Sequence, residues 1–233
     1  MWKRLGKVLQ IAQGDRFMIA ALLLQAFCTG IFAASLELGV TTMFLENVGT
    51  EGLPLAFMVS GAAGVLLAIA YSYFSRQLRI FAYGVLNLVS VLGLTGVLLT
   101  GFILWSGGAE DLSDFAHYTV FALSFPLVLI TLHGFWTTVR GKLTPSRGKQ
   151  LSGIIELALL AGMLLAFLST PVLVGPDFGI HNMIFIGLGS LVLAASSQLY
   201  VLSVHRSRRG PFVGRVHTSG PYKLFSHKYT ALM

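Results

Sequence analysis

All sixteen lysine and arginine residues of this 233-residue chain lie outside six long apolar stretches. If each stretch crosses a membrane once, all sixteen cations fall on one side. The connections on the other side carry acidic residues and no lysine or arginine. Cytoplasmic loops of membrane proteins retain an excess of lysine and arginine, so the basic side is predicted to be the cytoplasmic side. The pattern therefore predicts an integral membrane protein with both termini in the cytoplasm, most simply in a bacterial inner membrane.

Each apolar stretch is long enough to be a transmembrane helix, because about 20 residues cross about 30 Å of hydrocarbon. Transmembrane strands are only about ten residues long and alternate strictly, so strands are excluded. Charged residues make up 11% of the chain, against about 25% in water-soluble domains. We predict an all-α bundle of six transmembrane helices joined by short turns. The predicted spans are residues 17–44, 54–74, 80–105, 115–139, 151–174 and 180–204.

Two basic segments flank this predicted transmembrane domain of residues 17–204. Residues 1–16 either form an amphipathic helix on the membrane surface or serve only to orient the chain. Residues 205–233 form a basic cytoplasmic tail or the start of a connector to further helices. The net charge of +7 does not indicate nucleic-acid binding, because the cations occur in short groups beside the apolar segments.

No arrangement of residues indicates catalysis. The sequence lacks the G-x-S-x-G and H-E-x-x-H motifs and has one cysteine, and its six histidines are scattered without metal-ligand spacing. We therefore expect neither an enzyme nor a bound metal or cofactor.

The first span carries polar or small residues at a spacing of four, and with Ala26, Gly30 and Ala34 beside them they make one half of the helix small or polar. This polar stripe consists of Gln25, Thr29, Ala33, Glu37 and Thr41. Glu37 is an ionisable group within an apolar run, and such groups are costly and often functional. Two interpretations stay open: the stripe lines an aqueous route, or it is a small-residue packing face with one acid reaching toward the outer surface.

A second acid, Glu156, lies about 9 Å inside the cytoplasmic end of the fifth span by helix rise. His133 in the fourth span and Asn87 in the third lie at similar depths. We hypothesise that Glu156 pairs with His133 near Asn87. The alternative is a neutral carboxyl bonded to a backbone carbonyl. The candidate cavity-lining residues are Gln25, Thr29, Glu37, Asn87, His133 and Glu156.

The connection between the fourth and fifth spans, residues 140–149, is the most distinctive polar segment. It either contacts an anionic ligand or lipid headgroups, or only anchors the topology. It is not a phosphate-binding P-loop, because Gly148-Lys149 precedes glutamine and no upstream glycine pattern exists. The candidates for contact with an anion or a lipid are Arg140, Lys142, Arg147, Lys149, Arg206, Arg208 and Arg209.

Two stretches resemble a known family. Residues 44–57 (FLENVGTEGLPLAF), followed by residues 71–76 (YSYFSR), resemble the first two helices of the ATP/ADP-translocase-like branch of the major facilitator superfamily. Residues 144–151 (TPSRGKQL), with Phe135-Trp136 before them and Gly153 and Gly162 after them, are similar to the fourth-to-fifth helix connection of that branch. In helix order and loop polarity the resemblance covers most of residues 16–205.

The chain departs from that family in two ways. Its second-to-third helix connection is reduced to residues 75–79 (SRQLR), and it has six predicted spans where the family has twelve. Residues 222–229 (YKLFSHKY) resemble the approach to a seventh helix. The resemblance therefore implies an N-terminal half, with substrate bound between this bundle and a second one near the midplane.

The expected function is a membrane transport module for nucleotides or other anionic metabolites, working by alternating access. The alternative is a non-transporting membrane subunit that docks onto a larger complex, its tail contacting partners or anionic lipid. The expected partners are the lipid bilayer and either a second six-helix half or other membrane subunits.

Overall fold

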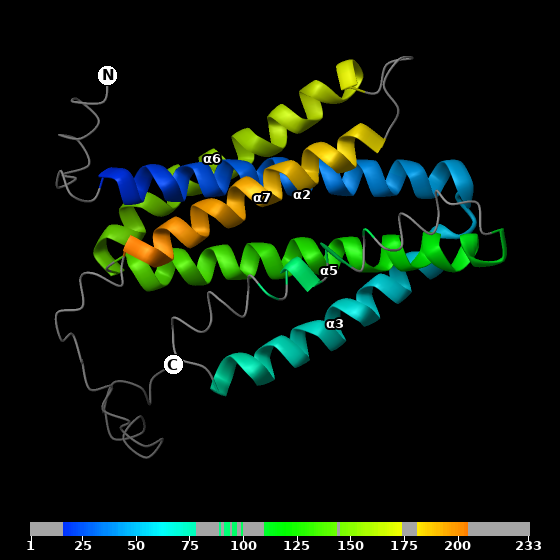
Figure 1. Ribbon diagram of the computed structural model, residues 1–233, viewed down its shortest axis with the longest axis horizontal. Coiled ribbons are helices and arrows are strands. Elements are labelled where there is room, and N and C mark those ends of the chain that lie inside the picture. Colours follow the sequence, from blue (N-terminus) through cyan, green and yellow to red (C-terminus); the bar gives the residue numbers. More distant parts are fainter. Residues whose placement is uncertain are drawn as a thin grey trace, which may run out of the picture.

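The computed structural model describes residues 16–77, seven residues between 89 and 99, and residues 110–143, 145–173 and 181–204. Five long helices run through these residues (Figure 1), and all five are long and apolar enough to cross a membrane. They are α2 (Arg16–Asn47), α3 (Leu53–Gln77), α5 (Glu110–Lys142), α6 (Pro145–Leu173) and α7 (His181–Val204). The protein is therefore an all-α integral membrane protein.

These helices correspond to the first, second, fourth, fifth and sixth predicted spans. The third predicted span, residues 80–105, lies largely outside the described residues, although those described there, such as Val91, are helical. The basic leader lies almost entirely outside them, and the tail does so completely.

Helix α2 forms the centre of the described bundle (Figure 1). Helices α5, α6 and α7 all pack against it, whereas α3 packs mainly on α5. Since α2 is covered from several sides, its buried residues do not form one apolar stripe, and they include polar and small side chains as well as large ones. Half of the residues of α2 are thus buried in contacts with other helices.

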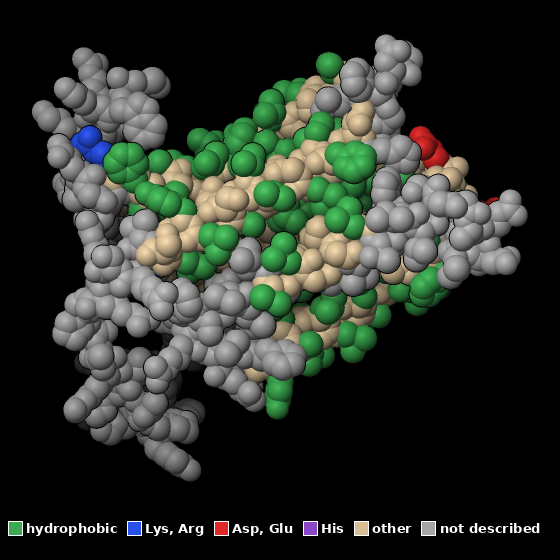
Figure 2. Space-filling model, viewed as in Figure 1, with side chains coloured by type: hydrophobic (Ala, Val, Ile, Leu, Met, Phe, Trp, Pro, Cys, Tyr) green, Lys and Arg blue, Asp and Glu red, His purple; other side chains and the backbone are tan. Residues whose placement is uncertain are grey.

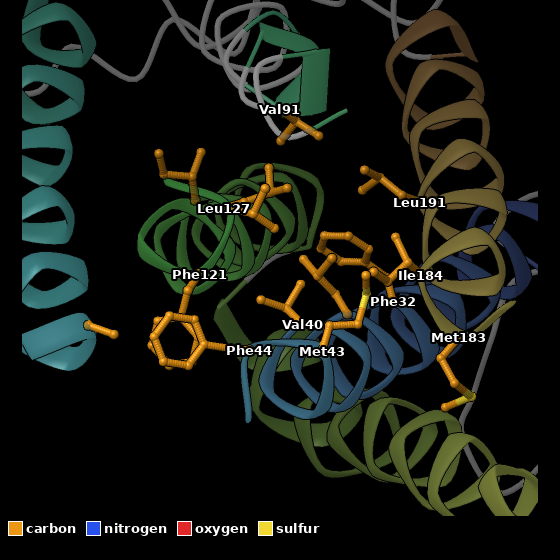
Figure 3. Packing of buried hydrophobic residues seen from close by; sticks show 14 residues of the cluster. Phe32, Val40, Met43, Phe44, Val91, Phe121, Leu127, Met183, Ile184 and Leu191 are labelled. Carbon is orange, nitrogen blue, oxygen red and sulfur yellow. The ribbon is translucent and has the colours of Figure 1, made fainter. Parts of the chain in front are cut away.

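Two apolar clusters fill the space around α2. The larger cluster joins α2 to α5 and α7 with large side chains (Figure 3), among them Phe32, Val40, Met43, Phe44, Phe121, Leu127, Ile184 and Leu191. The second cluster lies toward the other end of α2 and includes Leu22, Phe135, Ile155 and Val201. Together they hold α2, α5, α6 and α7 along most of the length of α2.

The crossing of α2 and α6 brings two backbones into direct contact. Each helix contributes a glycine at the crossing, Gly30 from α2 and Gly162 from α6. A Cβ atom on Gly30 would collide with the carbonyl oxygen of Leu159, and one on Gly162 with the carbonyl oxygen of Phe27. Small residues spaced by four permit such an approach in membranes. In α2 they are Ala26, Gly30 and Ala34, and in α6 they are Ala158, Gly162 and Ala166.

The turn between α2 and α3 confirms the short connection predicted there. The side-chain amide of Asn47 donates to the carbonyl of Met43 (2.7 Å), and the backbone N–H of Val48 donates to that of Phe44 (2.8 Å). Gly49 then adopts φ +84°, a conformation that residues with a Cβ atom rarely take. The chain reverses within a few residues.

Apart from Glu37 and Glu156, the charged side chains of the described helices gather at the two ends of the bundle, with apolar side chains between them (Figure 2). Arg16 begins α2 and Arg140 and Lys142 end α5, so these cations share one end. Glu46 and Glu51 lie at the opposite end, around the turn from α2 to α3. The bundle therefore has a basic end and an acidic end.

Candidate functional site

A pocket opens between α2, α3 and α5, with a volume of about 360 Å³. Its polar wall contains the carboxylate of Glu37, an exposed residue of α2, and the hydroxyl groups of Thr41, Ser60 and Ser124. The rest of the wall is apolar and comes from Phe57, Gly61, Phe121, Phe125 and Val128. A few convergent polar groups in a mostly apolar concavity are typical of small-molecule sites.

The helices position these polar groups through local bonds. Glu37 and Thr41 are four residues apart on α2, so both face the same side. The hydroxyl of Ser124 donates to the carbonyl of Phe121 (2.8 Å), which leaves the lone pairs of its oxygen to accept a further hydrogen bond. Ser60 is buried, and a Cβ atom on the neighbouring Gly61 would meet open space. The pocket thus offers acceptor oxygens at Glu37 and Ser124.

Aromatic rings pack on the wall of this pocket. The ring of Phe121 lies 4.7 Å from that of Phe44 and 5.1 Å from that of Phe57, and Phe44 also meets Tyr118 edge-on at 5.3 Å. Figure 3 shows Phe44 and Phe121 side by side between α2 and α5. These contacts tie α2, α3 and α5 together beside Glu37 and give the pocket one rigid wall.

Glu37 lies toward the acidic end of the bundle. It follows Arg16 by 21 positions in α2, a distance of about 31 Å along a helix. That is about the full thickness of the hydrocarbon layer. The carboxylate therefore lies near the boundary farther from Arg16, where water can reach it through the pocket.

The part of the polar stripe nearer Arg16 is enclosed in the bundle instead. Gln25 and Thr29 are 2% and 1% exposed and line a cavity of about 10 Å³ together with Thr131 and Gln198. The hydroxyls of Thr29 and Thr131 donate to the backbone carbonyls of Gln25 (2.8 Å) and Leu127 (2.7 Å). No described residue donates a hydrogen bond to the Oε1 atom of Gln25. Such a volume holds about one water molecule.

We expect Gln25→Leu to stabilise the isolated protein by about 1 kcal/mol, because it removes a buried acceptor that lacks a donor. Thermal unfolding of the detergent-solubilised protein measures this, with Thr29→Val as the comparison, since Thr29 already satisfies its hydroxyl. A lower stability of Gln25→Leu would contradict the expectation and show that the amide oxygen is paired in solution.

The structure does not join His133 to Glu156. His133 is exposed on α5, and its ring meets the ring of Tyr71 on α3 edge-on at 5.4 Å. Glu156 is exposed on α6, and no hydrogen bond or ion pair connects the two side chains. Asn87 lies outside the described residues. The hypothesised cluster of these three residues is therefore not assembled within the described bundle.

The basic candidates that the structure describes lie at the α5–α6 connection. Arg140 and Lys149 are exposed, Lys142 is half-buried, and Arg147 belongs to the first turn of α6. The tail candidates Arg206, Arg208 and Arg209 lie outside the described residues. In the described part of the chain, no group of three or more His, Cys, Asp or Glu side chains could hold a metal ion.

Ser60 of α3 and Ser124 of α5, which line the pocket together with Glu37, are not among the site residues predicted from the sequence. Each serine lies in an apolar run and carries no signal of its own. Whether these serines line the pocket depends on how α3 and α5 are rotated about their axes, and this rotation is known only from the packed bundle.

No protein-family model, curated protein or solved structure matches this chain. The family resemblance of residues 44–57 and 144–151 therefore supports a proposal only, and the established class is a helical membrane protein with five candidate spans.

Proposed function

We propose that the protein is one helical bundle of a membrane transporter of major-facilitator type. The observation that carries the proposal is the pocket between α2, α3 and α5, whose wall holds Glu37 near the hydrocarbon boundary farther from Arg16. Ionisable residues within transmembrane segments mark substrate and ion pathways. The resemblance of residues 44–57 to the first two helices of that superfamily agrees with this use of the first span.

The charge of the pocket constrains what enters it. Its one ionisable lining residue is Glu37, and the described cations Arg140, Lys142 and Lys149 lie at the other end of the bundle. An anionic cargo such as a nucleotide is therefore proposed to meet the basic end first. The pocket itself suits a proton or a small cation whose movement drives transport.

The basic end is proposed to face the cytoplasm of a bacterial cell, by the distribution of lysine and arginine. Single cysteines at Ser146 and at Glu51, in a Cys28→Ala background, test this in intact cells. A membrane-impermeant maleimide is expected to label only the cysteine at position 51. Labelling of both positions in intact cells would exclude the orientation.

Transport is tested in membrane vesicles from cells that naturally make the protein, so that any partner is present. Uptake of a labelled nucleotide or organic anion is expected to saturate with concentration, to respond to an imposed pH or sodium gradient, and to rise when the protein is overproduced. Uptake that does not depend on the amount of protein, across nucleotides and organic anions, would contradict the proposal.

The second candidate is a non-transporting subunit of a membrane complex. It is favoured by the large faces of α3 and α6 that no described helix covers, on which Leu66 and Leu168 are each 68% exposed. In that case flux would be insensitive to Glu37, and loss of the protein would instead lower the abundance of its complex.

A further inference from the structure

Helix α6 has two faces of different character. Its inner face, with Gly162 at the centre, contacts the backbone of α2. At 100° per residue, the opposite face carries Gly153, Glu156, Leu160 and Leu164. All four are exposed, and in Figure 1 α6 and α3 lie at opposite edges of the bundle. No described helix covers this outer face of α6.

The depth of Glu156 makes this face unusual. Glu156 lies about 9 Å inside the cytoplasmic end of the predicted fifth span, measured along the helix. Its neighbours Leu157 and Leu160 are 66% and 58% exposed, so its surroundings along the face are apolar. A glutamate side chain is too short to carry its carboxyl over that distance to the headgroups. Acids at such depths pair with other groups rather than face lipid alone.

This chain offers no membrane-embedded cation to pair with it. All sixteen lysine and arginine residues lie outside the six apolar stretches. A second copy arranged about a two-fold axis through this face would bring two Glu156 carboxyls together, which is unfavourable for like charges. The His133 ring packs on Tyr71 of α3, so its contact with Glu156 of another copy would join two different faces of the bundle and would not be a two-fold contact.

We propose that the outer face of α6 docks against a transmembrane helix from outside these 233 residues, and that this helix carries a lysine or arginine facing Glu156. The small residue Gly153, which is exposed and lies three positions before the acid, lets that helix approach closely beside Glu156. A Cβ atom on Gly153 would meet nothing within the chain, so the space beside it is open. The pairing of opposite charges in the membrane would fix the depth of the partner helix.

The proposal holds whether the bundle transports or only anchors a complex. It concerns α6, whereas the transport proposal concerns the pocket between α2, α3 and α5. A Glu37→Gln variant is therefore expected to leave the α6 contact intact, which separates failure of one proposal from failure of the other.

A photoreactive amino acid at Leu160, in the full-length protein in its native membrane, tests the contact. The matched control is the same amino acid at Leu66, which is exposed on α3. The expected product at position 160 is a crosslink to a membrane span that contains lysine or arginine, identified by sequencing the crosslinked peptide. Glu156→Leu is expected to reduce its yield at least about tenfold, a loss of about 1.4 kcal/mol, and to leave the Leu66 products unchanged.

A charge swap completes the test. Glu156→Lys should abolish the crosslink, and changing the partner's lysine or arginine to glutamate should restore it. Glu156→Gln, which keeps shape and hydrogen bonding, verifies that the bundle still folds. The proposal is overturned by lipid adducts alone, by a crosslink to a second copy, by a partner span without a basic residue, or by a yield that Glu156→Leu leaves unchanged.

Discussion

Gly162→Ala is expected to lower the free energy of unfolding by about 2–3 kcal/mol, and the melting temperature by about 4–12 °C. The added methyl group would collide with the carbonyl oxygen of Phe27, which belongs to the backbone of α2. A flexible side chain could move aside at little cost, but here two helices must separate. Gly30→Ala should act similarly, because its methyl group would collide with the carbonyl oxygen of Leu159.

The matched control is Gly153→Ala, the same change on the same helix. A Cβ atom there meets open space, and alanine favours helix over glycine, so stability should stay the same or rise slightly. Both variants are compared by thermal unfolding in one detergent. Equal melting temperatures for Gly162→Ala and Gly153→Ala would show that α2 and α6 do not touch through their backbones.

Glu37→Gln is expected to reduce gradient-driven uptake at least about tenfold, which corresponds to about 1.4 kcal/mol. The substitution keeps the size of the side chain but removes the one ionisable group that lines the pocket. A proton or cation would then have no carboxylate to bind. Because Glu37 is exposed, the melting temperature should stay close to that of the unmodified protein.

Glu46→Gln serves as the control for this second variant. Glu46 is exposed one residue before the end of α2 and does not line the pocket, so its removal changes the net charge equally without touching the proposed site. Initial uptake rates in vesicles compare the two variants. Equal rates for Glu37→Gln and the unmodified protein would favour the non-transporting subunit.

The five long helices could be predicted from the sequence because hydrocarbon thickness sets the length of a span. The surroundings of each polar residue could not. Gln25 and Glu37 both belong to the polar stripe of α2, but a spacing of four turns the stripe by about 40° at each step, so the two residues lie about 120° apart around the helix. Gln25 is enclosed by neighbouring helices, and Glu37 faces a pocket. Periodicity shows which residues share a face, but it does not show where along its length another helix covers that face.

The expected pairing of His133 with Glu156 illustrates the same limit. The depth of each residue follows from counting positions, and the estimates placed both near the basic end. Contact also requires that the two helices turn those residues toward each other. Helix α5 instead turns His133 toward Tyr71 of α3, and α6 turns Gly162, not Glu156, toward the bundle.

The central place of α2 has a consequence for biosynthesis. This helix is made before the other four described helices, yet α6 and α7, which cover much of it, come more than 90 residues later. Until they emerge from the ribosome, the amide of Gln25 and the bare backbone at Gly30 lack the neighbours that enclose them. We therefore expect the insertion machinery to shelter α2 until α6 and α7 are made, and a ribosome that stalls before residue 145 leaves α2 without its contacts to these two helices.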